Sequence, residues 1–330
     1  MDALTHAMAR IRSGRRVHGI SAVLLPYTAA GETDWTAFRG LLQATHRAGL
    51  DVAVNMDTGF GDLLSSAERE RVLDVTREVL GAGVVFHAGA YPDADAVDIV
   101  GSYHRSIAAI TARGAVPVIV QWRGMHVLPA AEKAALYGEI CRGCERAIGF
   151  ELGPMFAPHG EIWDDETFER ILEIPQLIGA KHSSLDRATE LRRLEARDRR
   201  RPDFRVYTGN DLAIDMVLYG SDYLLGLSAF APAMFARRDD ALAQGKLELL
   251  ALNDGLQHLG NVGFRAPVPA YKHSAAMFLH LTGALPSDHI HPRAARRPPS
   301  DRILLFDCAR RLGLIADERR VYAERVEALL

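Results

Sequence analysis

The sequence predicts an α/β protein that forms a closed (β/α)8 barrel, a TIM barrel, with a C-terminal helical subdomain. From residue 17 onward, short apolar runs alternate with amphipathic stretches about eight times, which is typical of a parallel sheet covered by helices. Eight such units in about 230 residues fit a closed barrel better than an open sheet. We expect an N-terminal extension (1–16), the barrel (17–245) and the subdomain (246–330).

The candidate strands are short apolar runs bounded by polar or glycine residues. They span 18–26, 51–55, 84–88, 116–122, 148–152, 177–181, 205–208 and 223–228. No G-x-G-x-x-G motif follows an early strand, so a dinucleotide-binding sheet lacks its main signature.

A helix is expected after each strand. Asp34 is placed to cap the first, and Ser65 with Glu68 has the spacing of a capping box before the second. These helices span 35–48, 69–80, 93–113, 130–146, 165–174, 188–197, 212–219 and 232–244. Beyond residue 245 only helical patterns occur, at 247–259, 271–281, 303–312 and 317–330, with an exposed crossing loop expected at 286–299.

The composition of the chain indicates which classes of partner to expect. A net charge of −3 with 25% charged residues provides no general basic field, so we expect no nucleic-acid partner. No stretch has the length of a membrane span or a signal peptide, so we expect a cytoplasmic protein that binds a small molecule and no membrane. Cys141 and Cys144 have no second metal-type pair nearby, so we expect neither a metal nor a cofactor.

Lys181 is the residue that points most directly to chemistry. A largely apolar run leads into this single lysine, and small polar residues follow it, which places it at the end of a buried strand. Burial disfavours the ammonium form, and a neutral amine can attack a carbonyl to form a Schiff base. The alternative is an ordinary strand-end lysine whose stem covers the core while its charge reaches water.

The other candidate site residues follow from the fold, because active sites of such barrels lie at the C-terminal ends of the strands. The polar and aromatic residues at those ends are Asp57, Thr58 and Gly59, then Trp122 and Arg123, Glu151, Lys181 and His182, Asn210 and Asp211, and Ser228.

Four motifs in this order resemble the dihydrodipicolinate synthase and N-acetylneuraminate lyase superfamily, of which the chain looks like a divergent member between about residues 17 and 314. They are Ala22–Tyr27 with Asp34, the Asp57-Thr58-Gly59 turn, Ile178–Lys181, and Gly209-Asn210-Asp211 with Gly226–Ser228. The resemblance implies that Lys181 forms an imine with a 2-oxo acid. It also implies that the Asp57-Thr58-Gly59 turn holds the carboxylate of that acid, and that the protein is a homo-oligomer, either a dimer or a tetramer.

Departures from the superfamily pattern concern proton transfer. Asp57 stands where the first loop threonine is expected, and Phe150 stands where the relay tyrosine is expected. An acid at Asp57 beside a substrate carboxylate requires that it be protonated or neutralised, or that the ligand be no ordinary 2-oxo acid. We therefore expect Lys181, Glu151, His182 and Asp57 to be catalytic, and Thr58, Gly59, Arg123, Trp122, Asn210, Asp211 and Ser228 to bind substrate.

Structural alternatives exist for three of these positions. Adjacent residues on a strand point to opposite faces, so His182 is as well explained by facing away from Lys181. Glu151 is as well explained by pairing with a basic residue such as Arg123, and His87 by a place in the core.

Three functions fit these residues. The first is a class I lyase, an aldolase or dehydratase that acts on a small 2-oxo acid or sugar-derived oxo compound. The second is a metal-dependent sugar isomerase or epimerase that uses Asp57, His87, Glu151 and His182 as ligands. The third is a ligand-binding relative without turnover.

Overall fold

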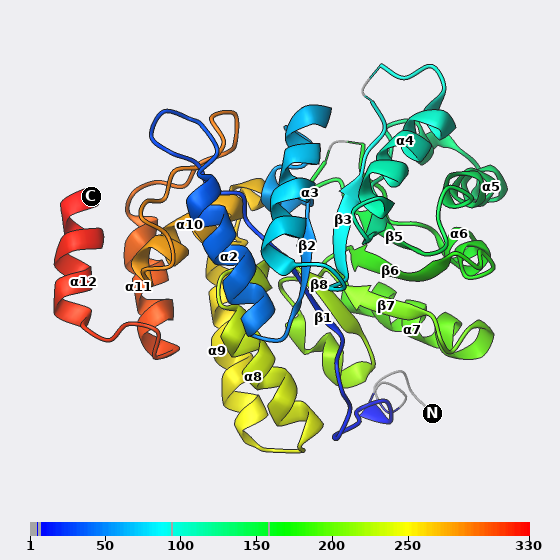
Figure 1. Ribbon diagram of the computed structural model, residues 1–330. Helices are drawn as coiled ribbons and strands as arrows, with labels where there is room; N and C mark the ends of the chain where they lie inside the picture. Colours follow the sequence, from blue (N-terminus) through cyan, green and yellow to red (C-terminus); the bar gives the residue numbers. More distant parts are fainter. Residues whose placement is uncertain (1–4, 6–7, 94, 158) are drawn as a thin grey trace.

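The fold is a closed barrel of eight parallel strands in sequential order, with β8 pairing back to β1 (Figure 1). We describe a computed structural model that covers residues 5, 8–93, 95–157 and 159–330. The strands are β1 (Gly19–Ala22), β2 (Asp51–Val54), β3 (Phe86–Ala90), β4 (Ala115–Ile119), β5 (Ala147–Leu152), β6 (Leu177–Ser183), β7 (Arg205–Thr208) and β8 (Asp222–Leu225). The predicted fold class is therefore confirmed.

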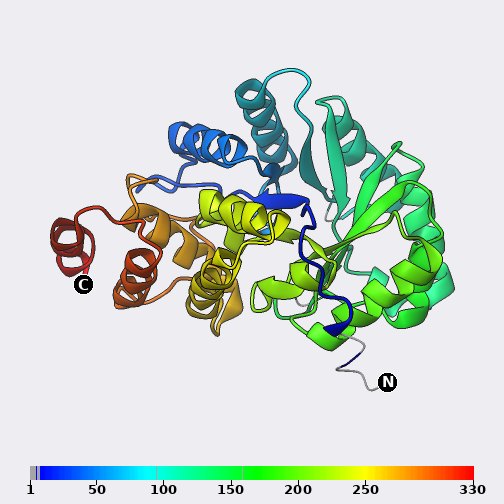
Figure 2. The same cartoon turned by 90° about the horizontal axis from the view of Figure 1, so that it is seen from below.

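Helices surround the barrel, and the last ones gather on one side of it (Figure 2). Those that follow the strands are α2 (Trp35–Arg47), α3 (Ser66–Leu80), α4 (Ile99–Thr111), α5 (Ala130–Cys141), α6 (Asp165–Ile171), α7 (Arg187–Arg200) and α8 (Pro232–Ala243). The C-terminal helices are α9 (Glu248–Gly263), α10 (Tyr271–Leu281), α11 (Asp301–Arg311) and α12 (Glu318–Arg325). In the described part of the chain, no helix has the length and apolar character that crossing a bilayer requires.

Strand alternation divides the core into two layers. One side of each strand fills the barrel interior, with Ile148, Phe150 and Leu152 of β5 among the interior residues. The other side packs against the helices. Because side chains alternate between the two faces, a shift of one residue moves a group from the lumen to the helix layer.

Local signals account for where the first two helices begin. The Asp34 carboxylate accepts the Ala37 N–H, and Ser65 with Glu68 forms the predicted capping box. Both caps satisfy amide groups that a helix start leaves unpaired, so the sequence defined these boundaries well.

Two segments differ from expectation. The helix expected at 212–219 is the 3-10 helix η3 (Ile214–Tyr219), a short segment that ends at Gly220 with φ 112°. The segment 286–299 is irregular, but it is not simply exposed, because Ile290 and Arg297 are buried. The Arg297 guanidinium donates to backbone carbonyls of the α9–α10 connection, which anchors the loop.

The expected division of the chain into 1–16, 17–245 and 246–330 stays a prediction. Helices α8 and α9 pack against each other across the second of these boundaries. The contacts therefore join the barrel to the helices that follow it.

Candidate active site

Lys181 lies near the C-terminal end of β6 and points into the barrel. It is in register with Phe150 on β5 and Tyr207 on β7, two residues of the interior layer. Its Nζ atom is 4.4 Å from the centroid of the Phe150 ring. Gly209 makes room for the side chain, because a Cβ atom there would lie 2.7 Å from Lys181 Cε.

The Lys181 amine is unlike the other buried lysines. Lys133 is 2% exposed and binds Glu161, Lys272 is 6% exposed and binds Asp57, and Lys181 is 7% exposed. Within the described residues, no hydrogen bond or ion pair holds the Lys181 amine. Burial lowers the pKa of this amine, and the charges of Asp211 and Asp57 oppose part of that shift.

Asp57 and Thr58 lie in η1 (Asp57–Gly59), the 3-10 turn that follows β2. Two residues with left-handed backbone flank the turn, Asn55 with φ 53° and Phe60 with φ 58°. Such conformations cost about 1–3 kcal/mol each in non-glycine residues and are enriched at functional sites. The Asn55 side chain donates to the Arg69 carbonyl, which helps to hold the turn in place.

The charge of Asp57 is balanced by a lysine of helix α10. Lys272 Nζ lies 2.7 Å from Asp57 Oδ1, and the Tyr271 hydroxyl donates to Asp57 Oδ2 at 2.7 Å. The Tyr271 hydroxyl also lies 2.9 Å from Thr58 Oγ1. Of the possibilities raised by an acid at this position, the geometry supports neutralisation by a cation.

The sequence reasoning did not identify Tyr271 and Lys272 as site residues. Both begin α10, some two hundred residues after the turn that they contact. The available signal was a polar Tyr-Lys-His-Ser start to a helix whose residues are nearly all buried. Burial is not visible in a sequence without the tertiary structure.

Asp211 follows β7 and is the titratable acid whose charge acts most strongly on Lys181. Its Oδ1 atom accepts the Leu227 N–H at 2.7 Å. Burial raises the pKa of Asp211 to about 7, although the Leu227 hydrogen bond and the Lys181 charge act against the rise. The expected substrate ligand is thus also able to exchange a proton near neutral pH.

Three further polar residues lie at or just after the C-terminal ends of β6, β7 and β8. Asn210 Nδ2 and Ser183 Oγ are buried and have no hydrogen-bond partner among the described residues, so they are available to a ligand. A Cβ atom on Gly209 would contact both Ser183 Oγ and Lys181 Cε, which places Ser183 close to the amine. The Ser228 hydroxyl instead donates to the Leu225 carbonyl and is already satisfied.

A cavity of about 470 Å³ lies beside the C-terminal ends of β2, β4 and β5. Asp57, Trp122, Arg123 and Phe150 are among its lining residues. Lys181 is not among its lining residues, but Phe150, whose ring centroid lies 4.4 Å from the Lys181 amine, is one of them. The predicted substrate residues Trp122 and Arg123 thus lie where a bound molecule would contact them, with Arg123 at the exposed rim.

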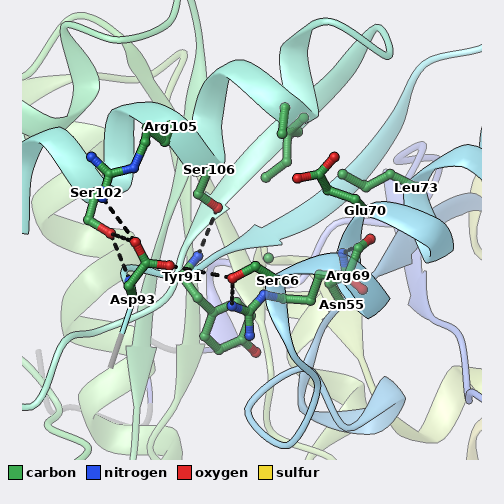
Figure 3. A pocket seen from close by; sticks show the side chains of 13 residues that line it. Asn55, Ser66, Arg69, Glu70, Leu73, Tyr91, Asp93, Ser102, Arg105 and Ser106 are labelled. Carbon is green, nitrogen blue, oxygen red and sulfur yellow. Dashed lines mark hydrogen bonds and ion pairs between the residues drawn. The ribbon is translucent and has the colours of Figure 1, made fainter. Parts of the chain in front are cut away.

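A smaller neighbouring cavity of about 180 Å³ lies between α3 and α4. Figure 3 shows the side chains that line it. Its polar residues bind one another: Asp93 accepts from Ser102 and Arg105, and the Tyr91 N–H donates to Ser106. Arg69 lies over the Tyr91 ring at 5.1 Å from its centroid. Tyr91 and Arg69 line both cavities, so this region forms a wall of the larger one.

Glu151 and His182 do not share the lumen with Lys181. Both point to the helix layer, because they directly follow the inward-facing residues Phe150 and Lys181, and successive side chains of a strand point to opposite faces. His182 Nδ1 lies 3.1 Å from Glu151 Oε1, and Arg193 of α7 contacts both Glu151 oxygens. Direct proton transfer from these two groups to a molecule on Lys181 is therefore not supported.

Glu151, His182 and Arg193 form a buried cluster that connects β5, β6 and α7. Burial acts to raise the pKa of Glu151, but His182 and Arg193 outweigh it and hold the pKa below its ordinary value. The Glu151 carboxylate also accepts the Trp163 N–H. Glu151 does pair with an arginine, but the partner is Arg193 and not Arg123.

The four residues of the metal-isomerase hypothesis are also separated. Asp57 is at the C-terminal end of the barrel, and Glu151 and His182 are behind the sheet. His87 is near the start of β3, at the opposite end. The geometry therefore does not support a metal site of that composition.

Comparison with solved structures places this barrel beside those of the dihydrodipicolinate synthase family. The Thermotoga maritima dihydrodipicolinate synthase has a TM-score of 0.75 at 18% identity, covering 91% of this chain and 100% of that one. The Acinetobacter baumannii enzyme, solved with pyruvate, has a TM-score of 0.75 at 20% identity, covering 91% and 100%. YagE from Escherichia coli K12, also solved with pyruvate, has a TM-score of 0.78 at 17% identity, covering 90% and 99%.

The structural likeness confirms, at the level of the fold, the resemblance that the motifs indicated. No curated protein matches the sequence. A family profile does match, over residues 16–330, and its description is a protein family of unknown function. The chain belongs to this family, DUF993.

Proposed function

We propose that this protein is a class I lyase, of aldolase or dehydratase type, that acts on a small oxo compound through a Schiff base on Lys181. The observation that carries the proposal is the contrast between the three buried lysines. Lys133 and Lys272 each have a carboxylate partner, whereas Lys181 has none among the described residues and its pKa is lowered by burial. A lowered pKa favours the neutral form of an amine, which is the nucleophilic form.

The reaction begins with attack of the Lys181 amine on the carbonyl carbon of the substrate. The carbinolamine loses water to give an imine, whose protonated nitrogen accepts the electron pair of an adjacent bond that breaks. Because Phe150 has no hydroxyl, it cannot carry the proton that this step releases. We assign that proton to Asp211, whose pKa of about 7 suits transfer in either direction.

The substrate class follows from the groups around the amine. Lys272 uses one of its three N–H donors on Asp57, which leaves donors for a substrate carboxylate near this turn. Asn210 Nδ2 and Ser183 Oγ suit hydroxyl or carbonyl oxygens. We infer a small 2-oxo acid or a sugar-derived oxo compound, with Arg123 at the rim contacting its far end.

The test is reductive trapping with borohydride in the presence of candidate 2-oxo acids, beginning with pyruvate, and of oxidised sugars. The chain contains only four lysines, at 133, 181, 246 and 272, so peptide mass mapping locates any adduct unambiguously. We expect one substrate-derived adduct on Lys181 and none in Lys181→Arg. An adduct on Lys272 or Lys246, or equal trapping in Lys181→Arg, would refute the assignment.

Product analysis after incubation without borohydride separates turnover from binding alone. Trapping with no product from any oxo compound would favour the ligand-binding relative without turnover. The expected dimer or tetramer stays a prediction.

A further inference from the structure

Two histidines and an aspartate converge on one point at the N-terminal end of the barrel, remote from the proposed active site. His18 precedes β1, Asp51 begins β2 and His87 is the second residue of β3. His18 Nε2 lies 2.8 Å from Asp51 Oδ2, and His87 Nε2 lies 3.2 Å from the same oxygen. One ligand-type atom from each residue falls within 4.8 Å of the others.

Strand alternation explains why these side chains meet. Ile20 and Ala53 belong to the interior layer, so residues 18 and 51, two positions earlier, also point inward. Phe86 and Ala88 belong to the outer layer, which leaves His87 facing the lumen. Because β1, β2 and β3 are neighbours, three inward positions at their starts share one small volume.

We propose that His18, Asp51 and His87 form a binding site for a divalent transition-metal ion such as Zn²⁺. Imidazole nitrogens and a carboxylate oxygen bind Zn²⁺ at about 2.0–2.2 Å, which in tetrahedral geometry separates the ligand atoms by about 3.3 Å. The two nitrogen-to-oxygen distances of 2.8 and 3.2 Å are close to that spacing. Small side-chain adjustments therefore complete the site.

The surroundings of the three residues also suit a metal. His18 Nδ1 lies 3.0 Å from the Tyr207 hydroxyl, the kind of outer contact that fixes the ring of a metal-binding histidine. The side chains of His18 and Asp51 are 32% and 40% exposed, whereas His87 is only 4% exposed. The buried ligand anchors the site, and the exposed pair provides a path for the ion and room for a water ligand.

The position indicates a structural role. The N-terminal face of such a barrel contributes to stability, and catalysis takes place at the opposite face. An ion held by residues at the starts of three adjacent strands would tie β1, β2 and β3 together. Its binding would stabilise the folded chain in proportion to the logarithm of metal concentration over the dissociation constant.

The experiment uses the full-length protein after chelator treatment. Co²⁺ is titrated while visible absorbance is recorded, and Zn²⁺ then competes with the bound Co²⁺. We expect about one equivalent of Co²⁺ with d–d bands that Zn²⁺ abolishes, and a melting temperature that rises with Zn²⁺. Asp51→Asn keeps the size of the side chain and should weaken binding by more than the 10–100-fold typical of losing an outer partner.

Three further variants make the result specific. His18→Gln changes a residue whose side chain is 32% exposed, so it keeps the test informative if Asp51→Asn impairs folding. Tyr207→Phe should weaken binding about 10–100-fold, and Lys181→Arg should leave it unchanged because that residue is at the other end of the barrel. The proposal is overturned if wild type shows no d–d bands, or if Asp51→Asn and His18→Gln bind Co²⁺ as tightly as wild type.

Discussion

Replacing the two buried site lysines by methionine should change stability in opposite directions. Lys181 has no hydrogen bond or ion pair among the described residues, so Lys181→Met removes a buried polar group that lacks a partner. Such a group costs about 1–3 kcal/mol in mutational data. The charge of Asp57 stays balanced by Lys272, and Asp211, with a pKa of about 7, is partly neutral at pH 7. We expect a net stabilisation of about 1–2 kcal/mol.

Lys272→Met is the matched control. It leaves the Asp57 carboxylate without its cation, and breaking a buried pair typically costs about 3–5 kcal/mol. The Asp57 side chain is 16% exposed and keeps the Tyr271 hydrogen bond, so we reduce this to about 2–4 kcal/mol. The two substitutions are chemically identical, and only the environment of the lysine differs.

Differential scanning calorimetry measures the difference. For 330 residues, an unfolding entropy of about 2.1 cal/mol/K per residue makes 1 kcal/mol equivalent to about 1.4 °C. Lys181→Met should therefore melt about 1–3 °C above wild type, and Lys272→Met about 3–6 °C below it. If Lys181→Met melts as low as Lys272→Met, Lys181 is an ordinary paired lysine and the case for a free amine fails.

Comparing wild type with Lys181→Met also predicts how the free energy of unfolding changes with pH. The pKa of Lys181 is lower in the folded state than in the unfolded state, so between those two values the unfolded chain binds more protons. Wild-type stability should then rise with pH across that window, relative to Lys181→Met. The advantage of Lys181→Met is largest below the folded pKa and disappears as the pH approaches the unfolded value of about 10.4.

Two other variants test the division of roles within the site. Asp211→Asn should lower kcat/KM about 10²–10⁴-fold and remove the ionisation near pH 7 from the pH–rate profile. If the variant keeps that ionisation in its pH–rate profile, Asp211 is not the group that transfers the proton. Because its folded pKa is raised, Asp211 also makes wild-type stability fall between about pH 4 and 7, and this decline should flatten in Asp211→Asn. Glu151→Gln should destabilise the protein by about 3–5 kcal/mol, because it breaks the buried pair with Arg193, and should leave borohydride trapping on Lys181 intact. If a folded Glu151→Gln variant loses trapping, Glu151 has a catalytic role after all.

The fold was predictable because its signal repeats along the chain. Eight alternations of apolar strand and amphipathic helix indicated the barrel, and every predicted strand has a counterpart in the structure. Lys181 was predictable for a related reason, since a lysine at the end of an apolar run is a local feature. The helix expected at 212–219 was less predictable, because a segment this short forms an α-helix or a 3-10 helix according to its packing.

The strand-end residues that face the lumen could not be predicted from strand position alone. Glu151 and His182 lie one residue from Phe150 and Lys181, and that single step places them on the other side of the sheet. Strand registers for all eight strands are needed to decide which member of each pair enters the lumen. Asp211 was found at the correct strand end, but its raised pKa depends on burial that only the packed structure defines.

The contact between Asp57 and Lys272 shows how an acid at this turn can lie near the buried amine of Lys181. Without Lys272, the carboxylate would add a second negative charge near Lys181 and would favour its ammonium form. With Lys272 in place, Asp57 has a partner of its own, and burial outweighs the charges of Asp211 and Asp57 and lowers the pKa of Lys181. Helix α10 thus contributes a cation to the carboxylate near Lys181, which under the proposed function helps to keep this amine reactive.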